Sequence, residues 1–268
     1  MKKYYILIIT LLLSIASNAQ PIPTVIVGST PDTLVLTVNG ANGTIQWQES
    51  TDSISWSNII GATINDYEVI TDNSVVGKHY YRAEISNSTI CENSTWYSSI
   101  IMGYKVINSI TELEIGDWYK GGVVFYFLVD GDIGYVAGET HGLIAPQQDQ
   151  SSGVEWGCDG TSIVGATSTS DGAANTTAIV AACSTRPIAA SICDTLTING
   201  YDDWFLPAID QLTHLYQQKN LVGGFTNDYY RSSTEYTSAT AWTYTFNGGY
   251  SVSYNKYVTY RVRAVRAF

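Results

Sequence analysis

Positive charge is scarce in this chain of 268 residues. Lys and Arg together number 13, against 24 Asp and Glu, and the formal net charge is −11 at pH 7. Nucleic acids and anionic membrane surfaces attract basic proteins, because their own charge is negative. We therefore expect neither of them to be a general partner.

Recognisable catalytic patterns are also missing. The three histidines, His79, His141 and His214, are far apart in the sequence, and no H-E-x-x-H, G-x-S-x-G or P-loop pattern accompanies them. Asp202 and Asp203 could be a glycosidase pair, but adjacent side chains usually point apart, so a structural role in a loop is favoured. No C-x-x-C spacing of the zinc type occurs. We expect a protein that is not an enzyme, with no catalytic residue, cofactor or metal site.

Long hydrophobic runs are confined to the start of the chain. Lys2 and Lys3 precede an apolar stretch over 6–15, and Ser17-Asn-Ala19 fits a cleavage site, so residues 1–19 are predicted to be a signal peptide. A membrane-anchoring helix would need about 20 apolar residues. The mature chain is expected to begin at Gln20, to contain no transmembrane segment and to be exported by the Sec route. Its destination is the periplasm, the outer-membrane surface or the extracellular space.

Cysteine is rare, with four residues at 91, 158, 183 and 193. In an exported protein such residues usually form disulfides. Cys183 and Cys193 are ten residues apart, and we favour this pair, which would close a small loop. Cys158 with Cys183 is the competing pair, and Cys91 has no obvious partner.

Short alternating runs dominate residues 20–103, which predicts an all-β sandwich. Trp47 and Tyr81 resemble the core Trp and the late Tyr of immunoglobulin-like domains, although the two core cysteines of those domains are missing. No charged, aromatic or glycine-rich cluster stands out. A spacer is therefore favoured over a binding module for this domain. Residues 104–112 are expected to be a linker.

Residues 113–268 are expected to form a second domain around the hub Trp204, Phe205, Leu206, Pro207 and Trp242. Pro207 predicts a helix from there to Lys219, and apolar residues recur after it at helical spacing. The alternation over 261–268 predicts a terminal strand, and the helix is expected to pack on the sheet that this strand forms with the Tyr-rich strands before it. Residues 121–137 predict a β-hairpin, whose turn at Asp130 and Asp132 lacks the later carboxylates of a calcium loop. Two short helices, broken at Pro187, are expected over 173–196.

The same region resembles a known family. The sequence Gly200-Tyr-Asp-Asp-Trp-Phe-Leu-Pro207, the segments 232–236 and 241–242, and the closing 262–268 are similar to the Lcl C-terminal domain family of bacterial cell-surface proteins. Arg231 and Ala208 stand where that family commonly has Trp and Ser. The resemblance implies a C-type-lectin-like α+β fold over 113–268. The expected fold class is thus an all-β Ig-like sandwich followed by an α+β C-type-lectin-like domain.

Residues 236–260 have a composition typical of binding surfaces: 6 Tyr, 5 Thr, 3 Ser, 2 Asn and 2 Gly. Tyrosine offers a large amphipathic contact at low entropic cost, and small polar residues adapt around it. The alternative is an ordinary sheet, because Thr and Tyr are also strand formers. The candidate ligand-binding residues are Tyr236, Tyr244, Tyr250, Ser251, Ser253, Tyr254, Tyr257 and Thr259, with Tyr244, Tyr250, Tyr254 and Tyr257 as anchors.

Most of these residues can be reached from an Asn codon by changing its adenines. In this the segment resembles the variable proteins of diversity-generating retroelements, which implies a diversified ligand-binding face. Five basic residues also give this acidic chain a locally positive region, so the glycan or protein ligand could be acidic; they are Arg231, Lys256, Arg261, Arg263 and Arg266. The function that these patterns favour is an exported, non-catalytic binding protein of the adhesin or receptor type. The alternatives are a structural spacer or envelope assembly protein and, less favoured, a polysaccharide hydrolase.

Overall fold

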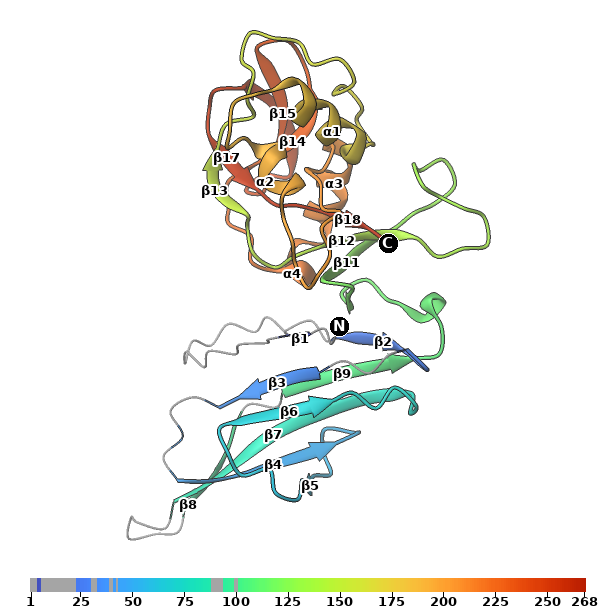
Figure 1. Cartoon of the computed structure of the whole chain (residues 1–268), viewed down its shortest axis with the longest axis vertical. Helices are drawn as coiled ribbons and strands as arrows, with labels where there is room; N and C mark the ends of the chain where they lie inside the picture. Colours follow the sequence, from blue (N-terminus) through green and yellow to red (C-terminus); the bar gives the residue numbers. More distant parts are fainter. Residues whose placement is uncertain are drawn as a thin grey trace. The chain divides into compact units, whose positions relative to one another are not determined.

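The computed structural model describes residues 4–5, 23–29, 33–38, 41, 43–87, 94–98 and 101–268. The chain forms two compact units, Met1–Leu113 (unit 1) and Glu114–Phe268 (unit 2) (Figure 1). The predicted signal peptide lies, except for Tyr4 and Tyr5, outside the described residues, and so does Cys91. Within the described ranges, no helix has the length and apolar character needed to cross a membrane.

Unit 1 consists of two sheets. One has the order β1-β3-β6, and the other has the order β2-β9-β7-β4-β5, with β8 paired to β7. Trp47 is fully buried between them, in a core to which β3, β4, β6, β7 and β9 all contribute. Its indole N–H donates to the carbonyl oxygen of Ile64 at 2.9 Å, which satisfies its one polar group. The strands are β1 (Tyr4–Tyr5), β2 (Thr24–Ile26), β3 (Thr33–Thr37), β4 (Thr44–Ser50), β5 (Ser57–Asn58), β6 (Asp66–Ile70), β7 (Gly77–Asn87), β8 (Ser94–Tyr97) and β9 (Ile101–Ile107).

The predicted linker at 104–112 is wrong in its first part. Residues 104–107 belong to β9, which pairs with both β2 and β7. Tyr104 and Val106 are buried in the core of unit 1, so these residues hold the sheet together. A short 3₁₀ helix, η1 (Ile110–Glu112), follows the strand.

Unit 2 combines two sheets with short helices. The smaller sheet has the order β10-β11-β12-β18, and the larger has the order β13-β17-β14-β15-β16. Its strands are β10 (Trp118–Tyr119), β11 (Gly122–Phe127), β12 (Gly142–Ala145), β13 (Ser151–Val154), β14 (Tyr229–Glu235), β15 (Thr240–Thr245), β16 (Tyr250–Asn255), β17 (Tyr260–Val262) and β18 (Arg266–Ala267). Its helices are α1 (Gly172–Ala182), α2 (Ala189–Asp194), α3 (Ile209–Gln217) and α4 (Lys219–Val222).

The hub is buried as predicted, but its helix begins later than expected. Trp204, Phe205 and Leu206 are at most 8% exposed. Phe205 exchanges two backbone hydrogen bonds, each of 2.9 Å, with Val265, so the hub is fastened to the C-terminal segment. Pro207 precedes the helix, because Ala208 is extended and caps α3, and the Gln211 side chain accepts from the Ala208 N–H at 2.9 Å.

The inner face of α3 packs on the larger sheet. Leu212 and Leu215 share a core with Tyr230 of β14 and with Phe246, which directly follows β15. Trp242 of β15 packs at the margin of this core. The predicted packing of the hub helix on the C-terminal sheet is therefore confirmed: α3 contacts β14, β15 and β16, and also β11 of the smaller sheet. The single terminal strand predicted over 261–268 is wrong, because β17 and β18 are separate strands that belong to different sheets.

The predicted hairpin over 121–137 has the wrong second strand. β11 pairs instead with β12, after a loop in which Gly134 and Gly138 adopt positive φ and Ile133 is 60% exposed. Such backbone turns prevent a continuous strand there. The Asp132 carboxylate accepts from the Val129 N–H and from the Tyr126 hydroxyl, both at 2.8 Å, as expected for a turn anchor. The two short helices on either side of Pro187 are confirmed by α1 and α2.

Candidate functional site

The register of the larger sheet in unit 2 gathers tyrosines on one face. Thr245 of β15 lies opposite Tyr229 of β14 on one side and opposite Tyr250 of β16 on the other. Residues directly opposite each other in a sheet point to the same face, as do residues two or four apart along a strand. Tyr229, Tyr250 and Tyr254 therefore share a face. Together with Tyr260, at the start of β17, they are called the tyrosine cluster below.

Three of the four rings of the tyrosine cluster touch one another. The centroids of Tyr229 and Tyr254 are 5.1 Å apart with the rings edge-on, Tyr229 and Tyr260 are 5.2 Å apart, and Tyr254 and Tyr260 are 5.1 Å apart. The hydroxyls are also linked, because Tyr229 is hydrogen-bonded to Tyr254 and Tyr250. The bond to Tyr254 is the main cause of a raised pKa of Tyr229. Tyr250 is 55% exposed and the other three are partly exposed, so the cluster is open to a ligand.

Arg231 lies beneath this face and is fully buried. Its guanidinium is 4.8 Å from the ring centroid of Tyr260, and Nη2 donates to the carbonyl oxygens of Asn255, at 2.8 Å, and of Val258. These carbonyls belong to the last residue of β16 and to the turn that follows it. Burial lowers the pKa of Arg231 to about 10. Arg231 thus anchors the turn that joins two parts of the tyrosine cluster.

The other basic residues of the region are engaged by carboxylates. Lys256 is fully buried and ion-paired with Glu235 at 2.5 Å, and Lys256 also donates to the carbonyl oxygen of Thr161. The remaining pairs are Arg261 with Asp149 and Asp228, Arg263 with Asp149, and Arg266 with Asp203. Each of these basic side chains is either buried or paired with a carboxylate, so the region presents little free positive charge at its surface. The charge-based expectation of an acidic partner therefore loses its basis.

The structure separates the predicted anchors. Tyr250 and Tyr254 belong to the tyrosine cluster. Tyr244 does not, because it pairs with Tyr230 on the opposite face, is 6% exposed, and donates its hydroxyl proton to the carbonyl oxygen of Gly249 at 2.9 Å. Its ring centroid is 5.3 Å from that of Tyr216 on α3. Tyr244 is a core residue, and its prediction as a binding anchor is wrong.

The other predicted site residues are divided between the turn next to the cluster and the opposite face of the sheet. Tyr257 is 55% exposed and its hydroxyl accepts from the Asn255 side chain at 2.9 Å; Thr259 is exposed in the same turn. Ser251 and Ser253 lie opposite Tyr244 and Trp242, so they share the other face of the sheet, and the prediction that they join Tyr250 and Tyr254 on one binding face is wrong. Tyr236 is 58% exposed and makes an edge contact with Trp242, with centroids 5.0 Å apart.

Sequence reasoning missed two members of the cluster. Tyr229 lies outside the tyrosine-rich segment 236–260, and only the pairing of β14 with β15 brings it to Tyr250 and Tyr254. Tyr260 is the last residue of that segment and could have been included on composition alone. For Tyr229 the local sequence gives no such signal, because two tyrosines stand side by side and only the first faces the cluster.

An aromatic cluster also exists in unit 1, where the sequence indicates none. The Arg82 guanidinium is 4.3 Å from the ring centroid of Trp56 and 4.0 Å from that of Tyr97. Its Nε donates to Gln48 at 2.7 Å. β8 brings Tyr97 next to β7, and this pairing joins aromatic residues that are distant in the sequence.

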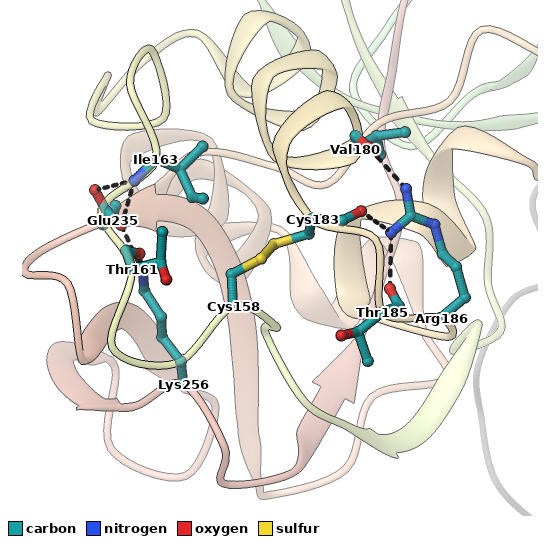
Figure 2. Close-up of a disulfide and its surroundings, with 9 residues drawn as sticks. All are labelled: Cys158, Thr161, Ile163, Val180, Cys183, Thr185, Arg186, Glu235 and Lys256. Carbon is teal, nitrogen blue, oxygen red and sulfur yellow. Dashed lines mark hydrogen bonds and ion pairs between the residues drawn. A yellow bond between two sulfur atoms is a disulfide. The ribbon is translucent and has the colours of Figure 1, made fainter.

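The disulfide joins Cys158 to Cys183, not Cys183 to Cys193 (Figure 2). Cys183 caps the C-terminus of α1 and its Cα atom is 5.7 Å from that of Cys158. Cys193 is instead fully buried on α2 as a free thiol, and burial raises its pKa. The competing pair is thus the observed one, because α2 directs Cys193 into the core. Figure 2 also shows two interactions of Glu235 near the disulfide: its carboxylate accepts a hydrogen bond from the Ile163 N–H and is ion-paired with Lys256.

Comparisons with known proteins give two family matches. Residues 147–266 match the Lcl C-terminal domain, which confirms the resemblance for that part of unit 2. Residues 15–102 match a domain of unknown function, DUF8696. The search of curated proteins found no match. Among solved structures, a fimbrial protein from Bacteroides ovatus ATCC 8483 is similar with a TM-score of 0.41 and 12% identity, over 88% of this chain and 70% of that chain.

Proposed function

We propose that the protein is an exported, non-catalytic binding protein of the adhesin or receptor type, and that the tyrosine cluster of unit 2 holds its glycan or protein ligand. The observation that carries the proposal is a group of four tyrosines on one partly exposed face. The rings of Tyr229, Tyr254 and Tyr260, from three strands, touch one another, and Tyr250 is hydrogen-bonded to Tyr229. Buried tyrosine is usual in a core, whereas a group of linked tyrosines at a surface is typical of binding sites.

The chemistry of the cluster suits a neutral or amphipathic partner. Ring edges and faces provide apolar contact for a sugar ring or an apolar side chain, and the hydroxyls both donate and accept hydrogen bonds. The hydroxyl contacts among Tyr229, Tyr250 and Tyr254 hold the rings in place before a ligand arrives. Such preorganisation lowers the entropic cost of binding.

The place of the cluster also suits variation. Tyr250 and Tyr254 lie on β16, which is the edge strand of its sheet in the described structure, and Tyr257 and Thr259 lie in the following turn. Substitutions on an edge strand and in a turn change the surface of the sheet and leave the pairing of its central strands intact. Diversification by a retroelement would be supported by a near-copy of this coding segment elsewhere in the genome, differing at adenines, and its absence would count against diversification.

Export is part of the same proposal. N-terminal sequencing of the protein from its native cells should begin at Gln20, and fractionation should find it outside the cytoplasm. An intact N-terminus beginning at Met1 in the cytoplasm would contradict this part of the proposal.

The function is tested by offering ligands to the full mature chain. A glycan array and a pull-down from surface proteins should both be run, and the proposal expects specific, saturable capture in at least one. A spacer or envelope assembly protein without ligand-binding function would capture nothing in either experiment. Release of reducing ends from a bound polysaccharide would instead favour a hydrolase.

A further inference from the structure

A second candidate site lies in unit 2, apart from the tyrosine cluster. An open pocket of about 430 Å³ is bounded by Trp118 of β10, the segment 146–150, and three aliphatic residues at 192, 196 and 198. Its volume falls in the range of pockets that take small ligands, roughly 300–1,000 Å³. We propose that this pocket binds a single uncharged sugar ring.

The wall formed by residues 146–150 is held firmly. Asp149 accepts from the Nε of Arg263 at 2.9 Å, from Arg261 at 3.1 Å and from the Tyr230 hydroxyl at 3.0 Å. Gly224 packs so tightly on this wall that a Cβ atom there would lie 1.7 Å from the carbonyl oxygen of Gln147. The pocket is therefore shaped before any ligand enters.

The pocket offers no free charge to a ligand. Asp149 is the only charged residue among the described residues that line it, and both oxygens of Asp149 are paired with arginines. An ionic ligand entering the pocket would lose water without gaining a counter-charge, which is costly. The ligand is therefore uncharged.

The polar groups that remain are side-chain amides. Gln150 is satisfied within the protein, because it donates to the Gln148 carbonyl oxygen at 2.7 Å and accepts from the Ala264 N–H at 2.6 Å. The side chains of Gln147 and Gln148 make no hydrogen bond within the described part of the chain, and both are accessible to solvent. Each amide can donate and accept. Two such groups can bond adjacent hydroxyls of a sugar.

The apolar part of the pocket fits the other side of a sugar ring. Trp118 is partly exposed and presents an indole, and Leu196 and Ile198 provide an aliphatic wall. A pyranose has a face of C–H groups that packs on such surfaces and a rim of hydroxyls that needs amides. A purely apolar ligand would make no hydrogen bond to either glutamine amide.

The two sites in unit 2 can be tested separately. Tyr230, whose hydroxyl meets Asp149 at the pocket, and Tyr229 of the tyrosine cluster are consecutive residues of a strand and so point to opposite sides. The pocket does not depend on the function proposed for the cluster, and the failure of one proposal leaves the other standing.

The test is saturation-transfer NMR and calorimetry of the full mature chain with glucose, galactose, mannose, fucose and N-acetylglucosamine. We expect at least one sugar to saturate with a Kd of about 1 mM, as befits so small a ligand. Gln148→Ala should weaken that binding about tenfold, which is the effect of losing one or two good hydrogen bonds. Leu196→Arg should abolish binding by filling the pocket.

Two control variants complete the experiment. Gln217→Ala on the exposed side of α3 is the control for Gln148→Ala, and Leu221→Arg on α4 is the control for Leu196→Arg. Both should bind the sugar as the unaltered protein does. Tyr250→Ala then assigns the bound sugar to one of the two proposed sites, because it changes the tyrosine cluster and leaves the pocket intact. The proposal is overturned if no sugar saturates, if Leu196→Arg still binds in its folded form, or if Tyr250→Ala alone removes binding.

Discussion

Tyr229 and Tyr230 are consecutive residues of β14 with opposite roles. The Tyr230 ring is fully buried, with its hydroxyl 3.0 Å from Asp149, whereas the Tyr229 ring lies 5.1 Å from that of Tyr254 on the partly exposed face. Successive side chains of a strand point to opposite faces of the sheet, and this separates the two tyrosines. One tyrosine stabilises the fold and the next is available for binding, although their local sequence is the same residue twice.

The same distinction predicts the effect of replacing Tyr244. Because Tyr244 is buried against Tyr216 and Phe246, Tyr244→Ala should lower the free energy of unfolding by about 3–5 kcal/mol, the usual cost of removing a large core ring. Tyr244→Phe removes only the hydrogen bonds of the hydroxyl, to Gly249 and to the Thr213 side chain, and should cost about 1 kcal/mol. Urea unfolding measures both values. A Tyr244→Ala variant with an unchanged free energy of unfolding would show that this tyrosine is not a core residue.

The buried pair of Lys256 and Glu235 should be sensitive to the loss of either charge. Glu235→Gln keeps an oxygen for the Ile163 N–H but leaves Lys256 charged and buried, which should cost about 3–5 kcal/mol. Combining it with Lys256→Met should recover part of that loss. Glu139→Gln, which breaks the exposed pair with His141, is the matched control and should change stability little. Equal, small effects of Glu235→Gln and Glu139→Gln would contradict the burial of the first pair.

The thiols should behave according to the observed disulfide. In the native, non-reduced protein, Cys193 should resist alkylation because it is fully buried and its raised pKa disfavours the thiolate. Cys158→Ser with Cys183→Ser should lower stability by about 3 kcal/mol, since the bridge closes a loop of 25 residues. Cys193→Ser should leave the bridge intact. Peptide mapping that finds Cys183 bonded to Cys193 would refute the assignment.

Unit 1 should lose stability at alkaline pH. Burial raises the pKa of Tyr81 and of Tyr104 above the ordinary value of 10.0, so the folded state holds their protons more tightly than the unfolded state does. This contribution to stability is complete below about pH 10 and is lost as the pH rises toward the raised folded values. The melting temperature, measured from pH 8 to 11, checks this prediction. It should decrease with rising pH, and it should decrease less in Tyr81→Phe. An unchanged slope in that variant would contradict the proposed role of Tyr81.

Local patterns in the sequence predicted the buried elements well. The hub of Trp204, Phe205 and Leu206, and the helix that follows it, depend on apolar spacing, which is a property of neighbouring residues. The burial of Trp47 in a β-sandwich core follows for the same reason. Such patterns report which face of an element is buried.

Long-range pairing could not be predicted in this way. The composition of 236–260 marks a tyrosine-rich region, but only the register of β14, β15 and β16 decides that Tyr254 is in the cluster and Tyr244 in the core. The basic residues show the same limit, because their carboxylate partners, such as Asp149 for Arg263, are remote in the sequence. The choice between Cys158 and Cys193 as the partner of Cys183 likewise depends on how α1 and α2 are placed.

The most direct test of the central claim is ligand capture by Tyr250→Ala/Tyr254→Ala, run beside Tyr236→Ala and the unaltered mature chain on the same glycan array and pull-down. Tyr236 is equally exposed but lies outside the cluster, which makes it the matched control. The account predicts that the double variant loses capture at least about tenfold, since central tyrosines contribute about 1–2 kcal/mol or more each, while it keeps its melting temperature. Capture by a folded double variant that equals that of the unaltered chain would contradict a binding role for the tyrosine cluster.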